Sequence, residues 1–139
     1  KELTTVKGAY EFVSKSKLNM FIGSNSMKDR IIDGLERVEL SQYFKPNQVY
    51  SFDLVDKPKP DPDIYLKAIE DNKLNKNQTI IIEDSSVGVQ AGVSAGIKVI
   101  GLTAGGHWHE ERNEKELFDA GAFTVTNDYN KIIEIINNN

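Results

Sequence analysis

The sequence contains no cysteine, which excludes disulfide bonds and thiolate metal sites. This absence fits a reducing compartment, and we expect a cytoplasmic protein. No apolar run is long enough to cross a bilayer. The chain also lacks a basic run, and its 21 acidic residues outnumber its 17 basic ones, so the net charge is −4. Nucleic acids and anionic membranes are therefore not expected partners.

The chain is long enough for one domain with a hydrophobic core, at 139 residues with 39% hydrophobic and 27% charged residues. It shows no internal repeat and no low-complexity linker, so we expect a single domain over residues 1–139. The first residue is Lys1 and not Met, so we expect that an upstream segment was removed, and a lost targeting segment stays possible.

A strand followed directly by a helix is predicted around residues 79–95. The apolar run 79–82 is typical of a strand buried on both faces of a parallel sheet. Ser85 or Ser86 can cap the helix that follows. Small residues recur at helical spacing and form a stripe that can lie close to the sheet: Gly88, Ala91, Gly92 and Ala95. Val89 and Val93 follow on a neighbouring stripe and are expected to pack against apolar surface.

Two adjacent carboxylates, Glu83 and Asp84, stand where this strand must end. Open α/β sheets bind ligands at the carboxyl ends of their strands. Neighbouring carboxylates repel each other unless a cation lies between them, and hard oxygen ligands suit Mg²⁺. The alternative is that both residues only favour the dipole of the following helix.

Strands and helices alternate along the whole chain. Strands are expected at 18–23, 48–52, 79–82, 98–102 and 122–125, and helices at the end of 1–17, at 28–39, 61–72 and 85–95, at 110–120 and after Asp128. Asp61 is the expected N-cap of its helix, with Pro62 at the first helical position. The alternation predicts an α/β protein with a doubly wound parallel sheet and helices on both faces.

Two further segments offer groups that suit a phosphate. Ser24 and Asn25 follow the predicted strand 18–23 and provide a hydroxyl, an amide and backbone N–H donors. Lys59 lies between prolines, so its ammonium is held on a rigid backbone and can neutralise phosphoryl oxygens. The alternatives are a plain turn, and a solvated linker lysine with Lys57 as an equally charged rival.

The remaining candidates are explained more simply without chemistry. His107 and His109 could form a two-histidine metal site, but a surface loop is the favoured interpretation. Asp61 and Asp63 are better explained as helix-capping residues than as catalytic acids.

Three motifs in order resemble the second to fourth motifs of the haloacid dehalogenase superfamily, in the branch of phosphoglycolate phosphatase and β-phosphoglucomutase. They are Phe21-Ile22-Gly23-Ser24-Asn25-Ser26, then Lys59-Pro60-Asp61-Pro62-Asp63-Ile64-Tyr65, then Ile82-Glu83-Asp84-Ser85-Ser86-Val87-Gly88-Val89-Gln90-Ala91-Gly92. The resemblance runs along nearly the whole chain, and the fourth motif is its most specific part.

The resemblance implies an Mg²⁺-dependent phosphatase for a small phosphorylated metabolite, acting through an aspartyl-phosphate. By the same resemblance Ser24 binds a phosphoryl oxygen, assisted by the backbone of Asn25, and Lys59 pairs with the phosphoryl group and the nucleophile. Asp84 holds Mg²⁺, directly or through water, and Glu83 supplements it. A sugar phosphomutase shares this core and stays an alternative. A non-catalytic phosphate-binding module and a receiver-type phosphoacceptor domain are alternatives of other classes.

The family's first motif, a strand that ends in an Asp-x-Asp pair, has no counterpart before Ser24. The helical cap that separates motifs one and two in this branch is missing as well. The family's sheet places the absent strand between the strands that end at Ser24 and Glu83. We therefore predict that a preceding N-terminal segment, a separate polypeptide or a swapped neighbouring chain supplies this strand and the nucleophile, because two facing unpaired edges are unfavourable.

Overall fold

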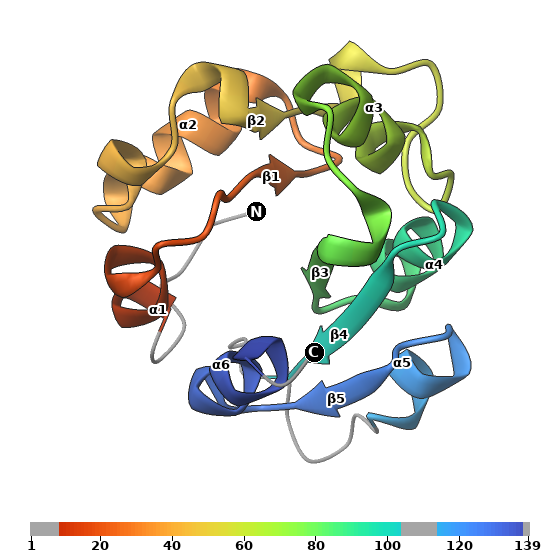
Figure 1. Ribbon diagram of the computed structural model, residues 1–139. Coiled ribbons are helices and arrows are strands. Elements are labelled where there is room, and N and C mark those ends of the chain that lie inside the picture. The colour runs from red at the N-terminus through yellow and green to blue at the C-terminus, as the bar shows by residue number, and fades with distance from the viewer. Residues whose placement is uncertain (1–8, 104–113, 138–139) are drawn as a thin grey trace.

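A computed structural model describes residues 9–103 and 114–137 and contains two parallel sheets in that part of the chain. In the first, β1 (Ile22–Gly23) pairs with β2 (Val49–Tyr50). In the second, β4 (Lys98–Leu102) lies between β3 (Ile80–Glu83) and β5 (Thr124–Thr126). Figure 1 shows the two sheets, with the helices on their outer sides.

Helices connect the strands, as the alternation predicted. They are α1 (Ala9–Lys15), α2 (Lys28–Arg37), α3 (Asp63–Asn72), α4 (Ser86–Ser94), α5 (Lys115–Asp119) and α6 (Tyr129–Asn137). Short 3₁₀ helices lie at Ser41–Tyr43, Pro46–Gln48, Phe52–Leu54 and Lys76–Gln78. The expected α/β class, with parallel sheets and helices on both faces, is thereby confirmed for the described residues.

The larger sheet is buried on both faces. Side chains alternate between the two faces along each strand, and helices cover both sides. On one face Ile81 and Val99 pack with Val89 of α4 and Leu117 of α5. On the other face Ile100 and Leu102 of β4 pack with α6, and partly buried side chains of α1 and β3 complete that cluster. The apolar runs of the sequence therefore predicted the strands that are covered from both sides.

The junction of β3 and α4 follows the sequence closely. The Ser85 hydroxyl accepts a hydrogen bond from the backbone N–H of Gly88 at 3.1 Å, so Ser85 is the N-cap. The small-residue stripe faces the sheet, and a Cβ added at Gly92 would press into Val99 and Ile81. Val89 is fully buried, and Val93 lies against Gly121 beyond α5 but stays 43% exposed, so the expected packing is confirmed for Val89 and only in part for Val93.

Several boundaries differ from the expectation. β1 and β2 are shorter than 18–23 and 48–52, and β5 begins later than 122. β2 ends early because the chain turns into the 3₁₀ helix Phe52–Leu54, where the Phe52 N–H bonds to the carbonyl of Ser26. Asp61 is not the N-cap of α3. Pro62 holds that position, since its carbonyl accepts the first helical bonds, and the Asp61 carboxylate lies instead 4.0 Å from Lys57.

β1 and β3 belong to different sheets and do not pair in the described part of the chain. A cavity of about 310 Å³ lies between the segments that lead into them. Its lining is mainly apolar and includes Leu18, Met20, Phe21, Ile80, Ile82 and Ile136. A gap in the sheet of this kind is what an absent middle strand would leave.

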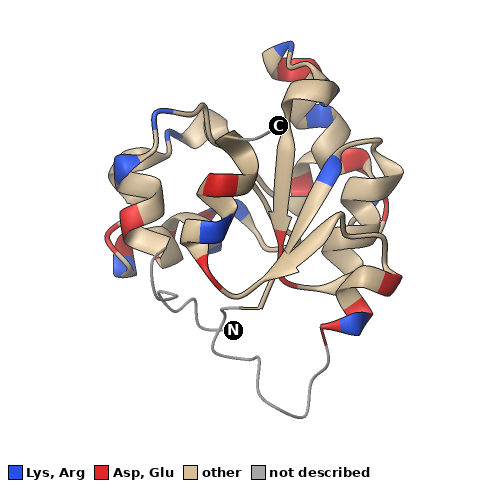
Figure 2. Ribbon diagram, turned by 60° about the horizontal axis from the view of Figure 1, so that its bottom comes forward, with Lys and Arg blue, Asp and Glu red and all other residues tan. Residues whose placement is uncertain are grey.

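The surface carries both signs of charge. Figure 2 shows acidic and basic residues interspersed over the helices around the sheets. Within residues 9–103 and 114–137, no helix has the length and apolar character needed to cross a membrane.

Candidate functional site

Lys59 joins the carboxyl ends of β1 and β3. Its ammonium donates a hydrogen bond to the carbonyl oxygen of Gly23 at 3.0 Å and forms an ion pair with Oε2 of Glu83. Both side chains are well enclosed, with exposed fractions of 10% for Lys59 and 8% for Glu83. Three segments that are distant in sequence therefore meet at one ammonium group.

The turn after β1 is tied to the backbone of Lys59. The Asn25 side chain accepts a hydrogen bond from the Lys59 N–H at 3.0 Å and donates one to the Lys59 carbonyl at 3.4 Å. This paired contact fixes the proline-rich loop against the end of β1. Asn25 thus has a positioning role that the sequence alone did not indicate.

Ser24 is half-buried at the end of β1, and its N–H bonds to the carbonyl of Tyr50 at 2.9 Å. Its hydroxyl oxygen accepts a hydrogen bond from the N–H of Ser26 at 3.1 Å. A hydroxyl that accepts in this way still has its own hydrogen to donate. Ser24 is therefore arranged to give a hydrogen bond to an anionic oxygen at the edge of the sheet.

Tyr65 completes the surroundings of Glu83. Its hydroxyl donates to the same Oε2 atom that Lys59 contacts, and its ring lies 5.1 Å from the Lys59 ammonium, within cation–π range. Burial raises the pKa of Tyr65 well above its usual range, and the charge of Glu83 adds to that effect. In the sequence analysis Tyr65 is named only as the last residue of the third motif and is given no role. Its place one helical turn after the Lys59–Asp61 segment was the available signal.

The first turn of α4 closes over Glu83. A Cβ added at Gly88 would collide with the Glu83 carboxylate, so this position requires a residue without a side chain. Glu83 is therefore enclosed by Lys59, Tyr65 and the backbone of α4.

Asp84 follows Glu83 beyond the end of β3 and is half-buried. Burial raises the pKa of Tyr129, at the start of α6, and the charge of Asp84 raises it further. Asp84 also contributes to the raised pKa of Tyr65. The negative charge of Asp84 therefore acts on tyrosines of two helices, Tyr65 of α3 and Tyr129 of α6.

The fit of these residues to Mg²⁺ is partial. Asp84 brings a hard carboxylate ligand to the strand end, as such a site requires. Glu83 presents Oε2 to Lys59 and Tyr65, so it serves first as their common acceptor. Residues 9–103 and 114–137 contain no group of three His, Cys, Asp or Glu side chains that could hold a metal. Asp84 can hold one coordination position, and other ligands have to come from elsewhere.

The structure separates the two rival lysines. The Lys57 side chain is 71% exposed and faces Asp61, whereas Lys59 is enclosed between β1 and β3. The predicted site residues lie together at one edge of the two sheets. Ser24 and Asn25 follow β1, and Glu83 and Asp84 stand at the end of β3. Lys59, on the proline-rich loop, contacts both strand ends. His107 and His109 lie outside the described residues.

A family model described as haloacid dehalogenase-like hydrolase matches residues 1–102. Among curated proteins, a phosphorylated carbohydrates phosphatase of Thermotoga maritima is 33% identical over 127 residues, which cover 90% of this chain and 55% of the relative. The chain thus spans about half the length of such a relative.

Solved structures agree with this similarity. A haloacid dehalogenase-like protein from Agrobacterium tumefaciens is 32% identical with a TM-score of 0.87, covering 94% of this chain and 59% of that protein. A haloacid dehalogenase family hydrolase from Deinococcus radiodurans, solved with bound phosphate and sodium, is 26% identical with a TM-score of 0.80, covering 93% and 57%.

Proposed function

Because this chain belongs to the haloacid dehalogenase-like hydrolase family, we propose that it forms the phosphate-binding half of a phosphatase for small phosphorylated metabolites. The observation that carries the proposal is the enclosed Lys59 ammonium, which joins the carboxyl ends of β1 and β3. A positive charge fixed at the edge of a parallel sheet is suited to a phosphoryl group.

Each residue has a distinct role in the proposed reaction. Ser24 donates its hydroxyl hydrogen to a phosphoryl oxygen, and the backbone N–H of Asn25 assists. Lys59 offsets the negative charge that develops on the phosphoryl oxygens. Glu83 orients Lys59, and Asp84 contributes a ligand to Mg²⁺. When bound, Mg²⁺ supplies further neutralisation of phosphoryl charge.

The chemistry consists of two displacements at phosphorus. A carboxylate oxygen of an aspartate outside this chain bonds to phosphorus, the phosphorus–oxygen ester bond breaks, and the leaving alkoxide takes a proton from solvent to become the product alcohol. Water then attacks the aspartyl-phosphate, which releases inorganic phosphate and restores the carboxylate. Ser24 and Lys59 hold the phosphoryl oxygens through both displacements.

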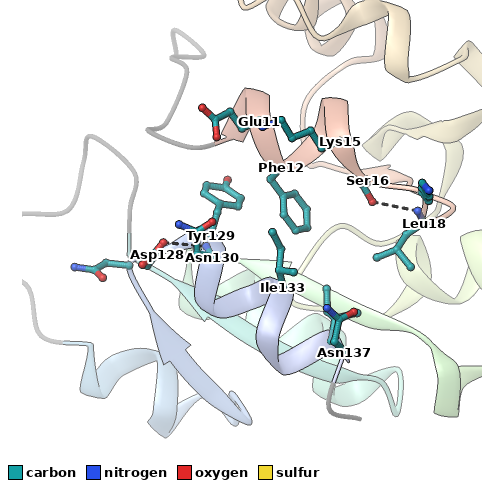
Figure 3. Close-up of a pocket in the computed structure, with 13 residues that line it drawn as sticks. Glu11, Phe12, Lys15, Ser16, Leu18, Asp128, Tyr129, Asn130, Ile133 and Asn137 are labelled. Atoms are coloured by element: carbon teal, nitrogen blue, oxygen red, sulfur yellow. Dashed lines mark hydrogen bonds between the residues drawn. The ribbon is translucent and has the colours of Figure 1, made fainter.

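The gap between β1 and β3 supports the proposal that the nucleophilic aspartate comes from outside this chain, on a strand that fills the gap. A second cavity of about 870 Å³ lies between α1 and α6 and shares Phe12, Leu18 and Ile136 with the smaller one. Figure 3 shows Phe12 of α1 beside the ring of Tyr129 and above Ile133 of α6 in this cavity. A strand inserted in the gap would satisfy both unpaired edges and bring its end to Lys59. An N-terminal segment or a swapped neighbouring chain could provide it.

The substrate class rests on the relatives. The Thermotoga maritima protein is named a phosphatase of phosphorylated carbohydrates, and we propose a phosphorylated sugar for this protein. The choice among such sugars depends on parts that the family places outside this core.

The test measures Mg²⁺-dependent hydrolysis of p-nitrophenyl phosphate by the full-length protein. We expect turnover that EDTA abolishes, and loss of about 100- to 1,000-fold in kcat on Lys59→Ala or Asp84→Asn, since each removes a preorganised charge. Lys57→Ala is the matched control, because this exposed lysine lies only two residues from Lys59, and its activity should stay within about twofold. No Mg²⁺-dependent turnover in the intact full-length protein would falsify the proposal.

A further inference from the structure

We propose that Tyr65 is a positioning residue, which holds the Lys59 ammonium in place through its shared contact with Glu83. This inference rests on the proposed function, because it concerns how the phosphate-binding lysine is oriented. The structure brings the Tyr65 hydroxyl and the Lys59 ammonium to one carboxylate oxygen, Oε2 of Glu83.

A lysine needs this support because its side chain has four rotatable bonds, and its ammonium is a point charge without a fixed direction. The Glu83 contact alone sets one distance and leaves the ammonium free to swing around the carboxylate. The Tyr65 ring removes much of that freedom, since it lies 5.1 Å from the ammonium and covers one side of it. The carbonyl of Gly23 limits the ammonium from another direction, at 3.0 Å.

Tyr65 is itself held firmly. Its neighbour Ile64 on α3 is 1% exposed, which anchors the helix in the core. The Tyr65 ring also lies against the end of β1, where its Cε1 atom is 3.1 Å from the place of a Cβ at Gly23. The ring therefore fills the space between the carboxyl ends of β1 and β3.

Packing alone does not account for the hydroxyl group. A phenylalanine would fill the same volume, but it would leave Oε2 of Glu83 with Lys59 as its single described donor. A buried carboxylate with fewer donors holds its remaining partner in a less defined geometry. The hydroxyl should therefore matter for Lys59 and for nothing else in the site.

The experiment is a double-mutant cycle in the full-length protein with p-nitrophenyl phosphate. We expect Tyr65→Phe to lower kcat about tenfold, in line with the loss of one charge-assisted hydrogen bond. In the Lys59→Ala background the same change should alter kcat by less than about twofold, because its effect passes through Lys59. Equal losses in both backgrounds, or no loss in either, overturn the proposal.

Tyr50→Phe is the control. Its hydroxyl is also enclosed and contacts a carboxylate, Asp71, at 3.2 Å and an amide, Asn72, at 3.0 Å, but its partners lie on α3 away from Lys59. Tyr50→Phe should leave kcat within about twofold. A tenfold loss in this control would mean that any buried tyrosine hydroxyl matters, which overturns a specific role for Tyr65.

Urea unfolding of the four proteins of the cycle, which are the wild type, Tyr65→Phe, Lys59→Ala and the double variant, separates this inference from the proposed function. If the wild-type protein shows no turnover, the phosphatase proposal fails, but the unfolding cycle still reports whether Tyr65 and Lys59 act together. We expect the two destabilisations to be non-additive. Additive effects on unfolding overturn the positioning role whatever the activity.

Discussion

The ion pair of Lys59 and Glu83 is the residue-level feature that most limits substitution. Each charge loses nearly all its water on folding, and the two charges offset this cost only while both are present. Exposed pairs on the helices, such as Lys131 and Glu134, lose little water and contribute little. Removal of one partner should therefore destabilise the protein strongly at the enclosed pair and only slightly at the exposed pair.

We predict that Lys59→Met destabilises the protein by about 2–4 kcal/mol, because it leaves the Glu83 carboxylate enclosed without its cation. Adding Glu83→Gln should restore part of this loss. Lys131→Met, which breaks an exposed pair, should cost less than about 0.5 kcal/mol. Urea unfolding monitored by circular dichroism measures all three. If Lys59→Met and Lys131→Met lower the free energy of unfolding equally, the Lys59–Glu83 pair is not an enclosed ion pair.

The tyrosines near the site predict a loss of stability in alkali. Burial raises the pKa of Tyr65 and of Tyr129 above the ordinary value of 10.0. Their protonated forms therefore stabilise the folded state fully below pH 10, and this contribution falls as the pH rises above that value, since only the unfolded chain ionises there. Unfolding midpoints measured from pH 8 to pH 11.5 should fall above pH 10. The fall should be shallower in Tyr65→Phe, and an identical pH profile would contradict the assignment.

At the scale of elements, β3 and α4 form the unit that positions Glu83 and Asp84. The stripe of small residues lets α4 lie close to the sheet, with Gly92 against Val99 and Ile81. The capping hydroxyl of Ser85 fixes the start of the helix directly after the acidic pair. The close approach of helix and strand therefore sets where both carboxylates lie.

We predict that Gly92→Ala destabilises the protein by about 1–3 kcal/mol, because the added methyl group must displace α4 from Val99. Ser94→Ala, at an exposed position of the same helix, should change stability by less than about 0.5 kcal/mol. Thermal unfolding compares the two variants. If Gly92→Ala is as stable as Ser94→Ala, α4 does not depend on the close approach.

Local sequence predicted this unit well because its signals are local. A β-branched run, a serine cap and small residues at helical spacing lie within a few residues of each other. The extent of β1 and β2 was not predictable in the same way, since a strand's length depends on partners that are distant in sequence. Asp61 illustrates the same limit, because a favoured capping residue lost its place to Pro62.

The sequence predicted the charged residues of the candidate site but not the residues that hold them in place. Lys59, Glu83 and Asp84 have chemistry that the sequence displays. The hydrogen bonds of Asn25 to Lys59 span 34 residues, and the contact of Tyr65 with Glu83 spans 18. Contacts at such separations have little local signal beyond the place of Tyr65 in the third motif, so the fold was needed to show what these two side chains contact.

At the scale of the whole molecule, the two sheets leave facing strand edges and a cavity of about 310 Å³ between them. Unpaired edges beside apolar side chains favour association with another strand. We predict that the 139-residue chain alone binds the dye ANS and forms concentration-dependent oligomers in light scattering, whereas the full-length protein does neither. A monomeric chain that does not bind the dye would mean that the gap is closed.

In the proposed reaction, Ser24, Lys59 and Asp84 act on one phosphoryl group. A crystal structure of the full-length protein with Mg²⁺ and vanadate tests it most directly. We predict that the vanadate oxygens contact the Ser24 hydroxyl and the Lys59 ammonium, and that Asp84 binds the metal directly or through one water. Vanadate bound away from the ends of β1 and β3, or three side chains that face separate parts of the protein, would contradict it.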